Sequence, residues 1–271
     1  MRASRTALLL TLLFVAVPTV TLSPARAQTP AAAPAQTEQK TFAYEVVSIT
    51  PRKSGDESSS WRTATDRIVM TNVPLISLVY SAYHIIIDDQ ISGLPGWARS
   101  DRYDIQAKMD EQATAAWKNL TRQEQSQQQQ LMIQALLADR CQLKVHRETK
   151  QLPVYDLVIA KGGLKMKEAK AAADSRYMFG PGHFNAQSVS IESLSSSLSG
   201  EVGRIIVDKT GLGEKKFEFD LKWTPDDQQG TADAGPSLFA AIEEQLGLKL
   251  VSSRGPVETV VVDHMEKPSE N

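Results

Sequence analysis

A single cysteine, with a histidine five residues after it, is the first candidate for chemistry in this sequence. A thiolate nucleophile needs an accessible, electropositive setting and a nearby base, and His146 is close enough to Cys141 to be considered. Cys141 also follows the apolar residues 136–138 on a predicted helix, which favours a small buried side chain. We therefore expect Cys141 to be buried and unreactive, and the Cys141–His146 pair belongs to the hydrolase alternative given below.

The histidines do not form a metal-binding pattern. None has another histidine, a cysteine or a carboxylate at the H-x-x-x-H or C-x-x-C kind of spacing. The glycines at 162–163 and 180–182 lack the spacing that cradles phosphate. The sequence therefore assigns no catalytic residue, no metal ligand and no cofactor. The histidines are His84, His146, His183 and His264.

The segment Asp208-Lys209-Thr210-Gly211 opens the phosphorylated-aspartate motif of cation-pumping ATPases. Those pumps are large membrane proteins, and this chain has neither their membrane spans nor their length. A turn is the simpler interpretation, because Thr210-Gly211-Leu212 has a counterpart in Ser92-Gly93-Leu94 and glycine readily supplies a positive φ. We expect a turn here.

Trp97 is the one candidate for ligand or partner binding. It follows Leu94-Pro95-Gly96, and an aromatic side chain in a Pro-Gly loop can contact a ligand. The alternative is that Trp97 covers the edge of a core.

Residues 1–27 have the three parts of a secretory signal peptide. Arg2 and Arg5 precede an apolar run, and Ala25-Arg26-Ala27 is a small-x-small cleavage signal. We expect export across a bacterial cytoplasmic membrane and cleavage after Ala27. The product would be periplasmic or secreted, with no transmembrane segment.

Charge and composition describe the rest of the chain. Removing residues 1–27 takes away three arginines and no acidic residue, which changes the net charge from −2 to −5. Such a chain is poorly suited to phosphate backbones, so nucleic acid is not an expected partner. Residues 28–40, rich in Ala, Pro, Gln and Thr, are expected to form a flexible tether.

Two stretches of the chain resemble each other in the same order. Each begins with an alternating strand that runs into an amphipathic helix, with Asn72 and Ser188 at the predicted N-caps. A second helix follows in each; in the first stretch it has a possible capping box at Thr121 and Glu124. The matched segments are 67–78 with 183–194, 85–88 with 205–208, 92–94 with 210–212, 103–107 with 217–221, 143–145 with 248–250 and 153–159 with 256–262.

These matches predict an α+β protein made of two tandem, diverged βαββαββ units. The first unit is expected at 41–161 and the second at 178–271, with a linker at 162–177. The predicted apolar faces of the helices are Leu75, Leu78, Val79 and Ala82; Leu131, Ala135, Leu136 and Ala138; Ile191, Leu194 and Leu198; and Leu238, Ala241, Ile242 and Leu246. The strand around Val46 has no partner within its unit, and we expect it to pair near 260–263.

One family resemblance rests on the segments 89–97, 101–105, 136–140, 143–148, 152–155, 207–212, 245–250 and 263–271. In these segments the chain resembles a large family of exported proteins of unknown function that is expanded in acidobacterial soil bacteria. Relatives of that family occur fused to membrane-bound metallopeptidase sensors, which implies a sensory or binding role. The pattern at 136–159 is also similar to the short N-terminal domain of secretins and TonB-dependent receptors, an interaction module of the cell envelope.

The leading functional hypothesis is a non-enzymatic binding or protein-interaction module of the cell envelope, with an envelope protein, a peptide or a glycan as partner. Exposed sheet edges could recruit a partner strand. The alternative is a hydrolase that acts on envelope or extracellular polymers.

Overall fold

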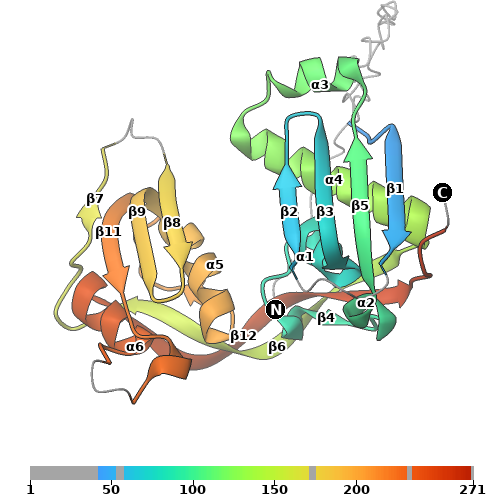
Figure 1. Ribbon diagram of the computed structural model, residues 1–271. Coiled ribbons are helices and arrows are strands. Elements are labelled where there is room, and N and C mark those ends of the chain that lie inside the picture. Colours follow the sequence, from blue (N-terminus) through green and yellow to red (C-terminus); the bar gives the residue numbers. More distant parts are fainter. Residues whose placement is uncertain (1–41, 53–57, 171–174, 231–233, 270–271) are drawn as a thin grey trace, which may run out of the picture. The chain divides into compact units, whose positions relative to one another are not determined.

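The computed structural model describes residues 42–52, 58–170, 175–230 and 234–269 (Figure 1). Helices combine there with mixed and antiparallel sheets, and each of three sheets has four strands. The predicted α+β class is therefore confirmed. The predicted signal peptide and tether lie outside the described residues.

The first sheet has the strand order β1-β5-β3-β2 and is antiparallel. Its buried side chains form one hydrophobic core with helices α1 and α4. The apolar face predicted for α1 is buried. The bounds are β1 Val46–Pro51, β2 Ser60–Thr63, β3 Arg67–Pro74, α1 Leu75–Tyr83, α2 Trp97–Ser100, β5 Arg102–Lys108, α3 Glu111–Trp117 and α4 Arg122–Cys141.

The third sheet repeats this order with later strands, as β7-β11-β9-β8. It forms a second core with helices α5 and α6 and the π-helical turn that continues α6. The apolar faces predicted for these helices are buried. The bounds are β7 Lys167–Glu168, β8 Arg176–Gly180, β9 His183–Ser190, α5 Ile191–Val202, β11 Lys216–Lys222, α6 Leu238–Ala241 and the turn Ile242–Leu246.

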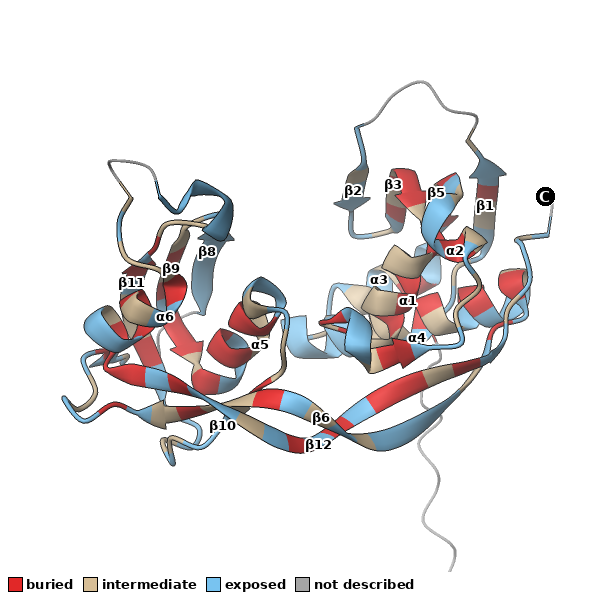
Figure 2. Ribbon diagram, turned by 90° about the horizontal axis from the view of Figure 1, so that it is seen from below, coloured by how far each residue is buried: buried red, intermediate tan, exposed pale blue. Residues whose placement is uncertain are grey.

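The second sheet is built on two long strands, β6 Lys144–Ile159 and β12 Leu248–His264, which pair antiparallel along almost their whole length (Figure 2). Two short strands pair parallel with them: β10 Ile206–Asp208 with β6, and β4 Ile91–Ser92 with β12. The second half of β6 thus packs beside the second core, while the second half of β12 completes the first. Leu157 belongs to the second core, whereas Val260 and Val262 belong to the first.

The prediction of two separate strands where β6 lies, and of two more where β12 lies, is wrong. The segments 143–145 and 153–159 are joined in β6, and 248–250 and 256–262 are joined in β12. Pro153 and Pro256 do not interrupt the pairing, because they lie opposite Arg254 and Gln151 within the ladder. Gly255 makes no turn either, since it stays in register opposite Leu152.

Two further strand predictions are wrong. The strand expected at 85–88 lies instead at Ile91–Ser92, after a 3-10 turn at Asp88–Gln90. The strand around Val46 pairs with β5, not near 260–263. The backbone groups of β1 thus have their partners in β5, at the edge of the first sheet. Strand β12 pairs with β4 and β6.

The N-cap predictions are also wrong. Helices α1 and α5 are capped by Pro74 and Ser190, two residues later than expected. Asn72 and Ser188 instead have φ values of 56° and 58°. Each lies where the register of its strand pair shifts, as in a β-bulge.

Helix α4 begins at the predicted capping box of Thr121 and Glu124. Its buried face is rotated from the predicted one: of the four residues named, only Leu136 is buried, and Leu131, Ala135 and Ala138 are exposed. The buried residues of α4 are Met132, Ile133, Leu136, Leu137 and Cys141.

The duplication and its domain boundaries stay predictions. Each core draws residues from both of the ranges 41–161 and 178–271, because β6 and β12 are shared between them. The predicted linker at 162–177 includes β7 and the first two residues of β8.

Candidate functional site

Strand β8 is an edge strand with unusually apolar side chains. Among the described residues no strand pairs with its outer side. Tyr177, Met178 and Phe179 are 61%, 62% and 37% exposed. In an antiparallel ladder, alternate residues direct their backbone N–H and C=O groups away from the partner strand, so half of the polar backbone of β8 is available for pairing.

The aromatic side chains of β8 continue into the core. Tyr177 and Phe179 lie opposite Ala186 and Phe184 of β9, and their rings contact the buried ring of Phe184 at 5.9 and 5.0 Å between centroids. We call Tyr177, Phe179, Phe184, Phe219 and Trp223 the aromatic shelf; the remaining ring contacts within it are Phe184–Phe219 at 5.1 Å and Phe179–Trp223 at 6.2 Å.

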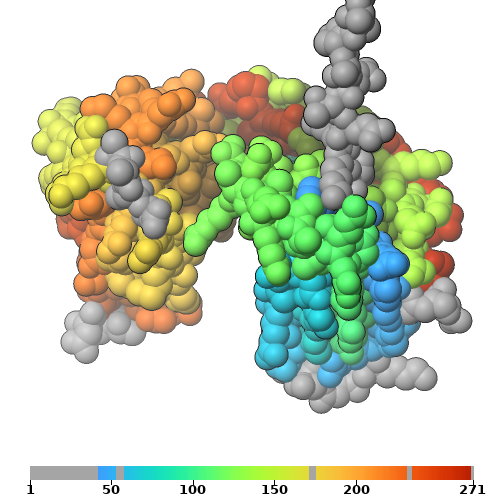
Figure 3. Space-filling view, turned by 90° about the horizontal axis from the view of Figure 1, so that it is seen from above, coloured from blue at the N-terminus to red at the C-terminus, as the bar shows by residue number. Residues whose placement is uncertain are grey.

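The edge strands β7 and β2 are less apolar than β8. Strand β7 consists of Lys167 and Glu168, which pair with Glu218 and Lys215. Strand β2 has one large apolar side chain, Trp61, beside Arg62. Charged side chains protect a sheet edge from pairing with another chain. Strand β8 lacks this protection between Arg176 and Gly180, and segments in its yellow colour reach the surface in Figure 3.

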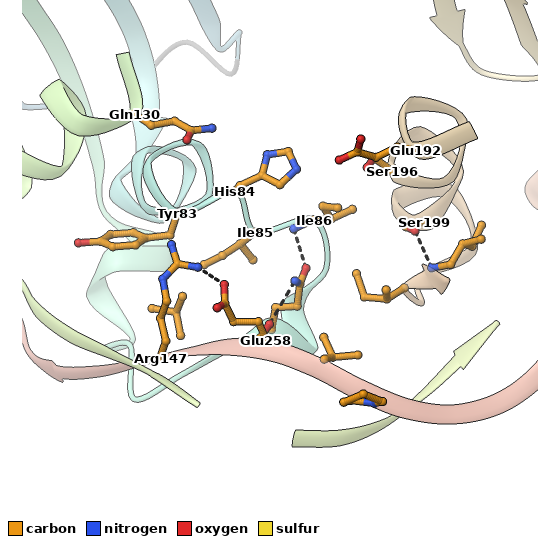
Figure 4. Close-up of a pocket in the computed structure, with 16 residues that line it drawn as sticks. Tyr83, His84, Ile85, Ile86, Gln130, Arg147, Glu192, Ser196, Ser199 and Glu258 are labelled. Carbon is orange, nitrogen blue, oxygen red and sulfur yellow. Dashed lines mark hydrogen bonds and ion pairs between the residues drawn. The ribbon is translucent and has the colours of Figure 1, made fainter. Parts of the chain in front are cut away.

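A pocket of about 410 Å³ contains several polar side chains (Figure 4). Arg147 and Glu258 form an ion pair there. Gln90 accepts a hydrogen bond from the backbone N–H of Ile86 at 2.9 Å, and Ser199 accepts one from that of Ile206 at 2.8 Å. The side chains of Arg147, Glu258, Gln90 and Ser199 thus connect neighbouring segments of the chain.

Cys141 and His146 have separate surroundings. Cys141 is fully buried, as predicted, and burial raises the pKa of its thiol to about 12. Both ring nitrogens of His146 have carboxylate partners: Nδ1 lies 2.9 Å from Asp263 and Nε2 lies 3.2 Å from Glu148. Hydrogen bonds to Asp263 and then Glu148 raise the pKa of His146.

A second histidine–carboxylate cluster crosses the third sheet. Asp220 lies 2.5 Å from Nε2 of His183 and accepts a hydrogen bond from Asn185 at 3.1 Å. Lys222, then His183 and Asn185, lower the pKa of Asp220 through hydrogen bonds. The sequence did not indicate this cluster, because His183 and Asp220 are brought together only by the register of β9 with β11.

The segment that begins at Asp208 is a turn, as expected. The Asp208 carboxylate accepts hydrogen bonds from the backbone N–H and the hydroxyl of Thr210 at 2.8 and 2.7 Å. Gly211 and Gly93, the two residues matched in the sequence, have φ values of 71° and 77°. The aspartate therefore stabilises the turn through its side chain.

Trp97 begins helix α2 and packs against the first core. The ammonium group of Lys267 lies 5.9 Å from the centre of its ring, which fits a cation–π contact. Trp97 thus covers the edge of a core, and its role in binding stays a prediction.

Within the described residues, no three or more His, Cys, Asp or Glu side chains are grouped so that they could hold a metal ion. In the same part of the chain, no helix has both the length and the apolar character of a membrane span.

Comparison with known proteins gives one family. The profile of the family described as "Protein of unknown function (DUF3738)" matches residues 76–265. No curated protein and no solved structure matches the chain.

Proposed function

The chain belongs to the DUF3738 family, and we propose that it is a non-enzymatic interaction module of the cell envelope that binds an extended peptide segment of a partner protein. The apolar outer edge of β8 carries this proposal. The peptide pairs with the backbone of β8 as an added strand, and its apolar side chains cover Tyr177 and Phe179. Backbone hydrogen bonds supply affinity in this mode, and alternate side chains supply specificity.

The contrast between edges supports β8 as the place of binding. A long apolar edge is an aggregation hazard, and the charged strand β7 shows how the same sheet is protected on its other side. Leaving Tyr177, Met178 and Phe179 uncovered is consistent with a partner that covers them. A peptide is favoured over a glycan because β8 offers a row of backbone groups to match.

Two diverged copies of one unit would explain how such an edge arose. The common strand order of the first and third sheets supports this origin. The edges β2 and β8 occupy the same position in their sheets, but only β8 has three consecutive exposed apolar side chains. One edge would then have specialised for binding while the other kept a structural role.

Export would place this edge outside the cytoplasm. The basic start, apolar run and cleavage signal of residues 1–27 support a periplasmic or secreted product. The intact mass of the protein recovered from the envelope or the medium tests this: we expect a chain that begins at Gln28. A mass that includes residues 1–27 would count against export with cleavage.

Peptide binding is tested with a random dodecapeptide library displayed on phage. We expect enrichment of peptides with alternating apolar residues. On addition of such a peptide, the backbone amides of Tyr177 and Phe179 should exchange with solvent at least tenfold more slowly. Tyr177→Lys and Phe179→Lys should abolish binding, because an edge lysine opposes pairing.

The matched control is Trp61→Lys at the corresponding edge strand β2, which should bind the peptides as the wild type does. Absence of any enriched peptide, or protection of β2 in place of β8, would refute the proposal. Dimerisation of the purified chain through β8, detected by light scattering and amide protection, would instead identify a second copy as the occupant.

A further inference from the structure

A cavity of about 320 Å³ lies next to the aromatic shelf. It is formed by the end of α5, the start of α6, strand β6 and the segment that follows β11. Trp223 belongs both to the cavity and to the shelf, since its ring contacts Phe179 at 6.2 Å. One end of a peptide that pairs with β8 therefore lies near the cavity. The lining residues are Tyr155, Glu201, Val202, Trp223, Asp226, Leu238 and Phe239.

Aromatic rings form part of the cavity wall. Tyr155 and Phe239 meet edge to face, with 5.3 Å between ring centroids. The guanidinium group of Arg204 lies 5.2 Å from the centre of the Tyr155 ring. Arg204 therefore already occupies one face of the Tyr155 ring, in a contact of the cation–π kind.

Two carboxylates complete the cavity, and their charge is not balanced. Glu201 and Asp226 line it and are exposed. Within the described ranges, neither side chain has a hydrogen-bond or ion-pair partner. Arg204 brings one positive charge near Tyr155, so the group retains a net charge of about −1 by count. Aromatic rings together with free carboxylates suit a cation that has an apolar stem.

We infer that this cavity receives a lysine or arginine side chain of the peptide that pairs with β8. The inference rests on the proposed function and names the partner's chemistry: an extended, alternating apolar segment followed by a basic residue. The methylene stem of that residue lies against Val202 and Leu238. Its charged end faces Glu201 and Asp226.

The test repeats the phage selection on three forms of the full chain: the wild type, the double variant Glu201→Gln, Asp226→Asn, and the control Asp227→Asn. Asp227 is the exposed neighbour of Asp226 but does not line the cavity. Peptides selected on the wild type and the control should have a lysine or arginine at a fixed distance from the apolar run. The double variant should select the same run without the basic residue.

One selected peptide is then compared with its norleucine analogue by calorimetry. The analogue should bind the wild type about fivefold more weakly, since a cation–π and charge contact at an exposed site contributes on the order of 1 kcal/mol. The double variant should not distinguish the two. Equal binding of both peptides to the wild type, or a basic preference that survives in the double variant, would overturn the inference. Selection of no peptide would overturn the proposed function itself.

Discussion

Asn72 and Ser188 share a backbone conformation that non-glycine residues seldom adopt. Their φ values are 56° and 58°. Each lies at a register shift in the strand before a helix, β3 before α1 and β9 before α5. The bulge redirects the chain so that the helix that follows can cover the sheet from which it emerges.

Replacing Ser188 with glycine is expected to stabilise the protein by about 1 kcal/mol, since a left-handed φ costs a side chain about that much. The Ser188 hydroxyl is also buried, with no hydrogen-bond partner in the described part of the chain. Urea unfolding gives the free energy of unfolding. Ser195→Ala, which removes the other buried unpartnered hydroxyl without a change at a positive φ, is the control and should have the smaller effect. A lower free energy of unfolding for Ser188→Gly than for the wild type would show that the positive φ of Ser188 is not strained.

Gly247→Ala should destabilise the protein by about 3 kcal/mol or more, because steric overlap adds to backbone strain. Gly247 has a φ of 67°, and a Cβ there would collide with the carbonyl oxygen of Gly163 and lie 2.9 Å from the backbone nitrogen of Lys165. Gly203→Ala is the matched control, because its φ is 63° and nothing lies within 4 Å of the added atom. It should cost about 1 kcal/mol. Similar losses in the two variants would show that the close approach at Gly247 is unimportant.

Cys141 should resist thiol reagents in the native state. With its pKa raised to about 12 by burial, the thiol has very little thiolate at pH 8, and the side chain is inaccessible. Labelling with a maleimide, followed by mass spectrometry, should proceed only as fast as the protein opens, and rapidly in urea. Ser252→Cys in a Cys141→Ala background supplies an exposed cysteine on β12 that should react at once. Rapid labelling of native Cys141 would refute its burial.

His146 should make the stability depend on pH. Its pKa is raised in the folded protein by Asp263 and Glu148, so the charged histidine contributes stability below its unfolded pKa of about 6.5. That contribution disappears as the pH rises through the folded pKa. Between pH 6 and 8, the Tm of the wild type should therefore fall relative to that of His146→Gln.

The control for this measurement is His84→Gln, since His84 has no carboxylate partner among the described residues. This variant measures the effect of replacing a histidine that lacks these contacts. A titration of the His146 ring by NMR should give a midpoint above 6.5. A midpoint below that value would contradict the two carboxylate contacts.

Local patterns predicted helices α1, α4, α5 and α6 and most strands, but not the short helices α2 and α3 or the pairings between distant strands. The periodic faces of α1 and α5 and the capping box of α4 follow from contacts within a few residues. The partner of β1 and the joined strands of β6 and β12 depend on contacts far apart in the chain. The rotated face of α4 has the same cause, because the position of a helix on its core decides between Leu131 and Met132.

The sequence patterns did not predict the candidate site at β8, and the reason is related. Residues 162–177 were predicted as a linker, and β8 begins within them. Tyr177 and Phe179 have strand character, but their exposure depends on β8 being the last strand of its sheet. Trp97, the residue singled out by its Pro-Gly loop, packs against a core instead.

The position of Val260 and Val262 in the first core has a consequence for the order of folding. These side chains lie near the end of the chain, yet they pack with residues that begin at Ile49. A nascent chain can therefore form the first sheet early but cannot close its core until β12 has emerged. The first core is incomplete without Val260 and Val262 of β12, and the second core takes Leu157 from β6. The two sheets and their shared strands should accordingly unfold as one cooperative unit, and proteolytic loss of the final segment would loosen the part of the protein that is made first.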